Sequence, residues 1–243
     1  MEIIDAHWEK ENLGLKTLEI VFNNEADILP IEKIKEYNYV VLKIPNKCVS
    51  KIHEAEEKGF FYIENQFFLS KKIQSINFDL KLQKFAESFE YCEVLNQTQL
   101  YEVLKNVNNG MFKTDRIFLD PKLGEELSKK RYVNWINTMF KQINRNKLFV
   151  IKEKKTQKDV GFFCLDVSDK IVYKGILAGI FNDYVNSGIG FLIIYFPLLF
   201  GLQMKTNRYI TSISANNIQV MNLYSHFSFQ IDEAFAVLRK ITR

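Results

Sequence analysis

The sequence predicts a mixed α/β fold, with helices on both faces of a twisted sheet. Short runs rich in β-branched residues alternate along the chain with longer runs whose apolar residues recur at helical spacing. The chain has 243 residues, of which 47% are hydrophobic and 14% aromatic, and this is enough to fill a substantial core. We therefore expect one large folded domain or two small ones.

The first part of the chain shows a strand–helix–strand pattern. Its expected strands cover residues 39–44, 60–69 and 75–82. Between the first two strands, residues 46–58 predict a helix that Asn46 caps and Gly59 ends. A polar run at residues 83–88 marks the expected boundary, so the first domain comprises residues 1–87.

The second part, residues 88–243, repeats the alternation over a greater length. Its expected strands cover residues 90–95, 148–152, 160–167, 171–180 and 208–214, and the strand-like end of the chain. Its expected helices cover residues 97–107, a segment that starts at Asp120-Pro121, 189–204 and 217–227. The second of these helices has one apolar face, formed by Tyr132, Trp135, Ile136, Met139, Phe140 and Ile143. The first part resembles a shortened version of this second part.

Composition argues against several functional classes. A net charge of +4 is too small and too dispersed for a nucleic-acid partner. The three cysteines, Cys48, Cys92 and Cys164, are far apart, and the three histidines show no metal-ligand spacing, so we expect no disulfide framework and no metal. Residues 1–5 have neither the basic start nor the apolar core of a signal peptide, which predicts a cytoplasmic protein.

One segment, Ile189 to Met204, is nearly all apolar. It is shorter than the roughly 20 residues that a membrane span needs, and Pro197 interrupts it. We therefore expect no membrane span and a helix that is buried against the sheet. Its broad apolar surface leaves one side available to a partner.

A short glycine loop precedes this helix. Its residues are Val185, Asn186, Ser187, Gly188, Ile189 and Gly190. Glycines let backbone amides converge, and the start of the following helix adds partial positive charge, so the loop suits a phosphate. It is neither a Walker loop, since no Gly-Lys-Ser/Thr follows, nor a dinucleotide fingerprint, since Ile193 stands where a third glycine would be. On its own the loop is more typical of a tight turn than of a phosphate site.

Asn217 and Tyr224 lie seven residues apart in a later helix-sized segment. Taken singly, Asn217 is a helix cap and Tyr224 is a core aromatic residue. Their order after the glycine loop suits a protein that holds a pyrophosphate at a helix start and places a phenol near the other end of the same ligand.

On this loop and the run from Asn217 to Tyr224, the second part resembles the GNAT superfamily of acyl-CoA-dependent N-acetyltransferases. The family loop reads Gln/Arg-x-x-Gly-x-Gly/Ala, and the family's later run ends in Leu-Tyr followed by Gly-Phe. Two departures occur, because Val185 replaces the Gln/Arg and Ser228 replaces the glycine before Phe229. The resemblance covers roughly residues 89–243 and implies a GNAT-like sheet that a smaller, incomplete GNAT-like domain precedes.

A narrower resemblance, to the family of TDP-fucosamine acetyltransferases, rests on two upstream segments. These are Thr114 to Pro121 (TDRIFLDP) and Arg131 to Ile136 (RYVNWI). Proteins of that family also carry an incomplete GNAT-like N-terminal half, to which Val40 to Phe68 is similar. This resemblance implies an acceptor amino group on a nucleotide-linked deoxysugar.

The GNAT resemblance implies direct acetyl transfer from acetyl-CoA. The implied coenzyme-binding residues are Ala178, Gly179, Ile180, Val185, Asn186, Ser187, Gly188, Ile189, Gly190 and Asn217. Backbone amides of the first three would hold the thioester carbonyl and its oxyanion, while amides of the glycine loop would bind the pyrophosphate. Tyr224 would donate a proton to the departing thiolate, since a free tyrosine has a pKa of about 10, comparable with that of a thiol.

The general base and the acceptor contacts are less defined. Asp115, Asp120 and Glu125 fall in the region that borders the acceptor in this fold, although caps and solvated loop charges explain them equally well. Arg116 would either meet a substrate phosphate or pair with Asp120. His226 lies on a different helix face from Tyr224 and is given no catalytic role.

The expected function is acetylation of a primary amine, with a nucleotide-linked amino-deoxysugar as the first choice of acceptor. An amino acid, a peptide N-terminus or a polyamine is the alternative acceptor, and an acidic pocket would favour the polyamine. A non-catalytic acyl-CoA-binding or interaction module is the alternative from another class, which the replacements at Val185 and Ser228 support. Many relatives of this fold dimerise, so a homodimer is expected.

Overall fold

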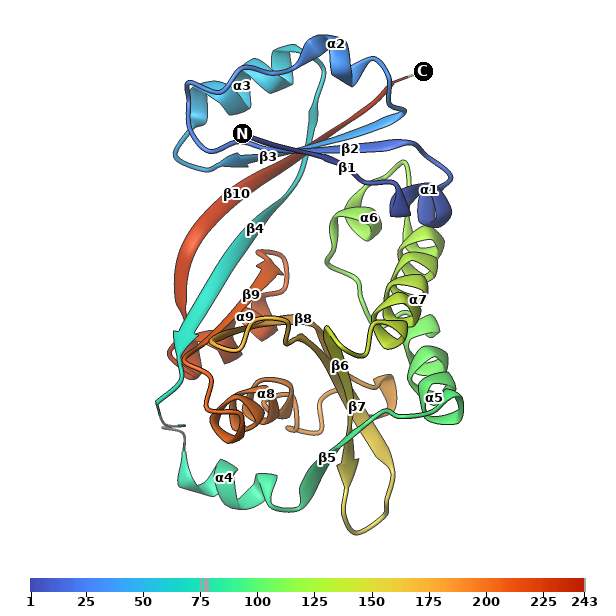
Figure 1. Cartoon of the computed structure of the whole chain (residues 1–243), viewed down its shortest axis with the longest axis vertical. Coiled ribbons are helices and arrows are strands. Elements are labelled where there is room, and N and C mark those ends of the chain that lie inside the picture. Colours follow the sequence, from blue (N-terminus) through green and yellow to red (C-terminus); the bar gives the residue numbers. More distant parts are fainter. Residues whose placement is uncertain (75, 77–78, 243) are drawn as a thin grey trace.

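The computed structural model describes residues 1–74, 76 and 79–242. In this part of the chain, the strands form one ten-stranded sheet in the order β1-β2-β3-β10-β4-β9-β8-β7-β6-β5 (Figure 1). The strands are β1 (Glu2–Asp5), β2 (Thr17–Val21), β3 (Tyr39–Pro45), β4 (Phe61–Lys72), β5 (Phe89–Glu93), β6 (Asn146–Glu153), β7 (Asp159–Asp166), β8 (Val172–Ile180), β9 (Arg208–Ser214) and β10 (Gln230–Ile241). The helices are α1 (Trp8–Leu13), α2 (Ile31–Ile34), α3 (Val49–Glu57), α4 (Leu80–Ala86), α5 (Gln97–Asn108), α6 (Arg116–Leu119), α7 (Glu125–Lys141), α8 (Leu192–Gln203) and α9 (Ile218–His226), with a 3₁₀ turn, η1 (Asn182–Tyr184). The predicted mixed α/β fold is confirmed.

Two strands, β4 and β10, join the halves of the molecule, and each has 12 residues. Strand β10 pairs antiparallel with β3 on one side and with β4 on the other. Strand β4 in turn pairs antiparallel with β9, so a strand of the first part of the chain lies between two strands of the second. The two parts therefore share one continuous sheet, and their division at residue 87 stays a prediction about folding units.

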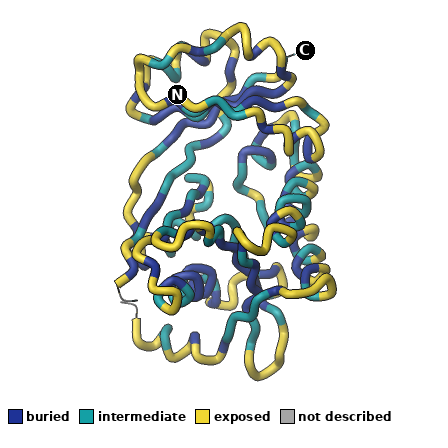
Figure 2. The backbone as a smooth tube through the Cα atoms, viewed as in Figure 1, coloured by how far each residue is buried: buried dark blue, intermediate teal, exposed yellow. Residues whose placement is uncertain are grey.

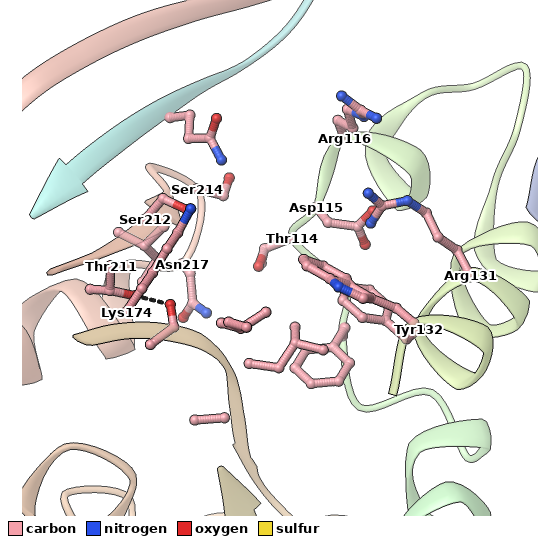
Figure 3. A pocket seen from close by; sticks show the side chains of 18 of the residues that line it. Thr114, Asp115, Arg116, Arg131, Tyr132, Lys174, Thr211, Ser212, Ser214 and Asn217 are labelled. Carbon is pink, nitrogen blue, oxygen red and sulfur yellow. Dashed lines mark hydrogen bonds between the residues drawn. The ribbon is translucent and has the colours of Figure 1, made fainter. Parts of the chain in front are cut away.

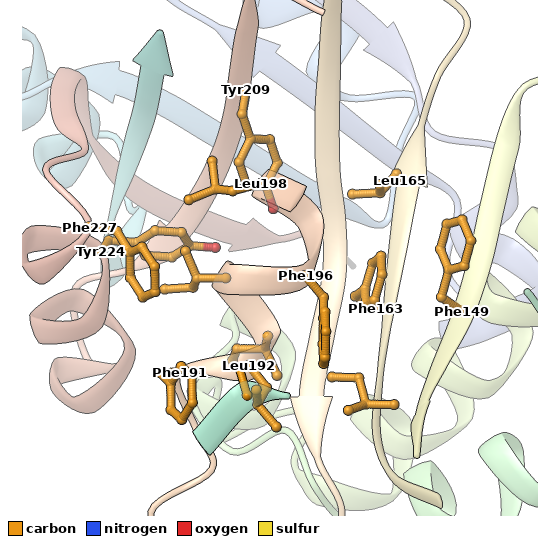
Figure 4. Close-up of a cluster of buried hydrophobic side chains, with 14 of the residues drawn as sticks. Phe149, Phe163, Leu165, Phe191, Leu192, Phe196, Leu198, Tyr209, Tyr224 and Phe227 are labelled. Carbon is orange, nitrogen blue, oxygen red and sulfur yellow. The ribbon is translucent and has the colours of Figure 1, made fainter. Parts of the chain in front are cut away.

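Helix α8 forms the centre of the largest core, on one face of the second half of the sheet (Figure 4). The hydroxyl of Tyr173 on β8 donates to the carbonyl of Pro197 over 2.7 Å, inside this helix. At Gly201 a Cβ would lie 2.5 Å from the same hydroxyl, so glycine permits the close approach of helix and strand. The predicted buried helix is thus present.

Helices α5 and α7 cover the opposite face of the same strands. Their apolar side chains, including Leu100, Val103 and Ile136, pack against Phe162 and Cys164 of β7. Burial follows this layering, since buried residues concentrate in the strands and in α8 (Figure 2). No helix in the described ranges is both long enough and apolar enough to cross a membrane.

The structure differs from the sequence-based expectation at four places. Of the predicted strand at 75–82, residues 75, 77 and 78 lie outside the described residues, and its last three residues belong to α4, which Asp79 caps. No helix starts at Asp120-Pro121, because α6 ends before Asp120 and α7 begins only at Glu125. The predicted apolar face ends earlier, since Ile143 lies beyond α7 and is 63% exposed. Asn46 does not cap the first predicted helix, because α3 begins at Val49 with Cys48 at its N-cap position.

A buried ion pair accounts for the structural role of Asp120. Its carboxylate is fully buried and accepts two hydrogen bonds from Arg239 of β10, over 2.7 and 3.0 Å. It also accepts one from the hydroxyl of Tyr39 on β3, over 3.1 Å. Asp120, which the sequence predicted as a helix cap, therefore links the α6 segment to the first half of the sheet.

Replacement of Asp120 by Asn should lower the free energy of unfolding by roughly 3–5 kcal/mol, because Arg239 would remain buried without its counter-charge. Urea unfolding measures this loss. The control is Glu32→Gln, which breaks an exposed pair with Lys35 and should change stability by less than about 1 kcal/mol. Equal effects of the two substitutions would contradict a tethering role.

Candidate active site

A cavity of about 700 Å³ lies between the two halves of the molecule. Strands β4, β8 and β9 form one wall, and the segment at 112–116 with helix α7 forms the other. Figure 3 shows Lys174, Ser212 and Ser214 facing Thr114 and Tyr132 across this space. The volume is in the range of small-molecule and cofactor sites.

The sheet presents a row of polar side chains to this cavity. Glu64, Gln66 and Phe68 alternate along β4 and all three line the cavity. The antiparallel register places Gln66 opposite Ser214 and Phe68 opposite Ser212, so these serines of β9 share the same face. The wall is therefore built by both parts of the chain.

Strands β8 and β9 part inside this wall. They are parallel and pair only from Val172 with Arg208 to Gly175 with Thr211. At the point of parting, β8 has an irregularity against β7, where Ile176 has no partner in the register. Beyond it, residues 177–180 of β8 pair with β7 alone, so their other edge faces an opening in the sheet.

The predicted residues Ala178, Gly179 and Ile180 lie along this open edge. Ala178 lines the cavity. At Gly179 a Cβ would lie 2.8 Å from the terminal methyl group of Met111, so the absence of a side chain lets Met111 pack on the strand. An unpaired strand edge offers backbone groups to an extended ligand.

The glycine loop, residues 185–190, precedes α8 as predicted. Asn186 and Gly188 have positive φ angles of 70° and 80°, which turn the backbone sharply. The amides of Gly188, Ile189 and Gly190 donate no hydrogen bond within the described part of the chain. Ile189 is buried and anchors the loop in the core, so these amides are fixed at the start of a 12-residue helix. This arrangement suits an anion.

Tyr224 is buried and lines the cavity next to the parting of the strands. It shares hydrogen bonds with Thr211 and Tyr209, and burial raises its pKa. Thr211 also donates to the carbonyl of Gly175 over 3.1 Å, where the pairing of β8 and β9 ends. A Cβ at Gly175 would overlap the hydroxyl of Tyr209, so glycine is required for the tyrosine pair to take this position.

The segment that carries Tyr224 keeps the geometry expected of the motif despite Ser228. Asn217 lines the cavity and caps α9, since its side chain accepts from the amide of Val220 over 3.3 Å. Ser228 has a φ of 57°, a conformation that favours glycine. The turn is nevertheless closed, because the amide of Phe229 donates to the carbonyl of Tyr224 over 3.0 Å.

An ion-pair network occupies the end of the cavity nearest the first half of the sheet. Arg116 donates to Glu19 over 2.7 Å and to Glu9 over 3.0 Å. Arg131 also contacts Glu9, over 2.8 Å, and Lys43 contacts Glu19 over 2.5 Å. Burial would raise the pKa of Glu19, but the charges of Arg116 and Lys43 lower it to about 2. Arg116 is thus committed to carboxylates of the protein itself.

The three acidic residues expected near the acceptor have other partners. Asp115 lines the cavity, but it caps α6 through the amides of Ile117 and Phe118 and accepts from Ser128 over 2.8 Å. Asp120 is buried against Arg239 and does not line the cavity. Glu125 is exposed at the start of α7 and pairs with Lys129.

Glu64 is a cavity residue that sequence reasoning missed. It is only 5% exposed, and its Oε2 has no hydrogen-bond partner in the described residues. Burial raises its pKa to about 7, although a hydrogen bond from Ser214 and the charge of Arg116 oppose the rise. The sequence held one signal, a carboxylate in the middle of a strand-like run at residues 60–69 that is mostly apolar.

This carboxyl group should make stability depend on pH. The pKa of Glu64 is about 7 in the folded protein against an ordinary value of 4.5, so the folded state binds the proton more tightly. Its contribution to stability is therefore present below pH 4.5 and is lost as the pH rises toward 7. Glu64→Gln should consequently be more stable than the wild type at pH 8, by on the order of 2–3 kcal/mol, and the gain should vanish near pH 4.

Urea unfolding between pH 4 and pH 8 measures this difference. The control is Glu233→Gln, an exposed residue of the adjacent strand β10, which should not reproduce this pH-dependent gain. A stability difference for Glu64→Gln that does not change with pH would contradict the raised pKa.

Over the described residues, no group of three or more histidine, cysteine, aspartate or glutamate side chains is arranged to hold a metal ion. The polar atoms of the cavity belong to hydroxyl and amide groups, to paired charges, and to Glu64 and Lys174. The chemistry that this cavity supports without further groups is hydrogen bonding, anion binding and proton transfer.

Comparison with known proteins establishes the fold. No protein-family model and no curated protein matches the sequence. A GCN5-related N-acetyltransferase from Sphaerobacter thermophilus is similar in structure, with a TM-score of 0.58 and 11% identity over 84% of this chain and 59% of that one. One from Kribbella flavida has a TM-score of 0.58 and 10% identity over 93% and 82%.

A glucosamine N-acetyltransferase region in a fungal multi-domain β-N-acetylglucosaminidase is also similar, with a TM-score of 0.57 and 11% identity over 82% of this chain and 25% of that one. The chain thus spans less than two thirds of the Sphaerobacter protein and of the fungal protein. At such low identities the likeness concerns the fold alone. The chain has the GNAT fold, as its glycine loop and its Asn217–Tyr224 run predict.

Proposed function

We propose that this protein is an acetyl-CoA-dependent N-acetyltransferase that acetylates a primary amine. The observation that carries the proposal is the parting of β8 and β9, with the glycine loop at the start of α8 and the Tyr224 hydroxyl beside the opening. These features provide a strand edge, an anion site and a proton donor around one cavity. A thioester of coenzyme A can use all three.

The coenzyme would bind along the open edge of β8. Backbone groups of residues 176–180 would pair with the pantetheine arm, and amides near Ala178 and Gly179 would stabilise the oxyanion. The free amides of Gly188, Ile189 and Gly190 in the loop of residues 186–190 would bind the pyrophosphate, as their position before a helix start favours. Val185 does not prevent this, because the contacts come from backbone amides.

Tyr224 would serve as the general acid. The amine attacks the thioester carbon, the carbon–sulfur bond breaks, and the thiolate takes the phenolic proton. Burial keeps the pKa of Tyr224 above its ordinary value, so the phenol holds its proton at neutral pH until a thiolate forms beside it. Its hydrogen bonds to Thr211 and Tyr209 fix the hydroxyl at the parting of the strands.

The preferred acceptor is an amino sugar, carried by a nucleotide. The cavity combines the aromatic rings of Trp8, Tyr132 and Trp135 with many side-chain hydroxyl and amide groups, which is the composition that binds sugar rings. The fungal glucosamine N-acetyltransferase region with a similar fold supports this class. Lys174 lines the cavity and has no ion pair in the described residues, so it is available to a phosphate, whereas Arg116 is not.

A polyamine is a less suitable acceptor. Several positive charges on the ligand would require unpaired carboxylates, but Glu9 and Glu19 are neutralised by arginine and lysine side chains. The carboxylate of Asp115 accepts a hydrogen bond from the amide of Ile117 at the start of α6. An amino acid or a peptide N-terminus needs one ammonium site only and remains the alternative acceptor.

A non-catalytic acyl-CoA-binding module is the second candidate function. It would share the coenzyme site but perform no transfer. The intact turn at Ser228 and the placement of Tyr224 at the opening favour the enzyme.

Acetyl-CoA should bind the protein in a one-to-one complex, measured by calorimetric titration. Gly188→Ala should weaken this binding at least tenfold, because a side chain at φ 80° strains the loop whose amides hold the pyrophosphate. The matched control is Gly59→Ala, which has a φ of 81° at the end of α3. Both variants should lose similar stability, but only Gly188→Ala should lose affinity for acetyl-CoA. Equal affinities of the two variants would show that the loop does not bind the coenzyme.

Tyr224→Phe should keep the affinity for acetyl-CoA and lose turnover by at least about 100-fold, because no group would protonate the thiolate. Release of free thiol with an amine acceptor measures turnover. Tyr101→Phe, on the exposed side of α5, is the control and should be fully active. Full activity of Tyr224→Phe would exclude Tyr224 from the mechanism.

A further inference from the structure

We propose that Glu64 is the general base that takes the proton from the acceptor's ammonium group. The inference rests on the proposed acetyltransferase function and names a group that the first part of the chain contributes to the same site.

The position follows from strand register. Glu64 lies two residues before Gln66 on β4, and Gln66 is paired with Ser214 at the end of β9. Ser214 leads directly into the segment in which Asn217 caps α9, the helix that carries Tyr224. The proposed base and the proposed acid therefore line one cavity, the base from β4 and the acid from the helix that follows its partner strand β9.

The hydrogen bonds around Glu64 leave one oxygen open. The hydroxyl of Ser214 accepts from the backbone amide and the side-chain amide of Asn216, over 3.3 and 3.4 Å. Its own proton is thus directed to Glu64, with which it shares a hydrogen bond. The second oxygen, Oε2, has no partner in the described ranges, although the residue is 5% exposed. A buried acceptor without a donor is costly, and an ammonium group would supply the missing donor.

The other carboxylates of the cavity are engaged. Glu19 is paired with Arg116 and Lys43, and Asp115 accepts from two backbone amides and Ser128. Both are tied to strongly favourable partners and would lose these contacts on taking a proton. Glu64 has no salt bridge in the part of the chain that the structure describes, so it can gain a proton without breaking one.

The ammonium group transfers one proton to the Glu64 carboxylate, which frees the nitrogen lone pair to attack the thioester carbon. Formation of the carbon–nitrogen bond releases a second proton from nitrogen to solvent. The carbon–sulfur bond then breaks, and Tyr224 protonates the thiolate. Tyr224 regains a proton from solvent, and Glu64 releases its proton to solvent. The products are an amide, free coenzyme A and one proton.

The ionisation of Glu64 suits this task. Burial raises the pKa of its carboxyl to about 7, and a general base is most effective when its pKa lies near the working pH. Three charged groups of neighbouring elements act on it: Arg116 and Lys43 lower the pKa, and Asp115 raises it. The neutral hydroxyl of Ser214 lowers the pKa as well, through its hydrogen bond. Burial also raises the pKa of Tyr132 on α7, and the charges of Asp115 and Glu64 add to this, so Glu64 is within electrostatic reach of the opposite wall.

The test compares wild-type protein, Glu64→Gln and the control Glu233→Gln in acetyl transfer from acetyl-CoA. The amines are glucosamine, a TDP-linked 4-amino-deoxysugar, lysine and spermidine, each at saturation, from pH 5.5 to pH 9. Glu64→Gln should lower kcat by about 100- to 1000-fold with a small change in KM, and should remove the fall of kcat below pH 7 that the wild type shows. Its affinity for acetyl-CoA should stay within twofold of that of the wild type, and Glu233→Gln should behave as the wild type.

Each contrary outcome has a distinct meaning. Transfer by Glu64→Gln at the wild-type rate with an unchanged pH profile would overturn the assignment and leave the acetyltransferase function standing. A rise in KM alone would make Glu64 a binding contact, which also overturns it. Absence of transfer by the wild-type protein to every amine would overturn both the function and the base.

Discussion

The parting of β8 and β9 is the constraint on which the rest of the site depends. Two parallel strands that pair over four residues and then separate leave a strand edge inside a sheet, where a strand would otherwise lie. Gly175 stands at the last paired position, where only a residue without a side chain leaves room for the Tyr209 hydroxyl. Tyr209 and Thr211 in turn form hydrogen bonds with Tyr224, so this packing places the phenol beside the opening.

The insertion of β4 between β9 and β10 gives the cavity its second wall. Because one strand of the first part completes the sheet of the second, Glu64 and Gln66 stand beside Ser214 although about 150 residues separate them in the chain. The buried contact of Asp120 with Arg239 fastens the α6 segment over the same space. The two parts are thus coupled through both walls, and the first part does more than support the second.

Local pattern was enough to predict most of the elements. The strand at 39–44, the helix at 97–107 and the strands and helices after residue 148 are found close to their expected bounds, because each carries a clear period and a cap or turn residue. The glycine loop and the Asn217–Tyr224 run were predicted as well, since both are continuous segments. The segment at 75–82 was read as a strand from its alternation, but its described end is helical because Asp79 caps α4.

What the sequence did not reveal depends on residues far apart in the chain. Asp120-Pro121 has the pattern of a helix start, but a partner 119 residues away, Arg239, decides the role of Asp120. Arg116 is of a residue type that commonly binds phosphate, but its guanidinium group forms salt bridges with Glu9 and Glu19. Glu64 carries no motif at all, and its meaning comes from burial and from Ser214, which only the strand register brings to it.

Hydrogen exchange of backbone amides with and without acetyl-CoA tests the central claim most directly, because it reports on the strand edge and the loop together. Binding along the open edge of β8 predicts that acetyl-CoA slows exchange in residues 176–180 and 186–190, while β1 and α2 at the far end of the molecule remain unchanged. Binding of acetyl-CoA without protection of either segment would contradict the claim that the parting of β8 and β9 is the coenzyme site.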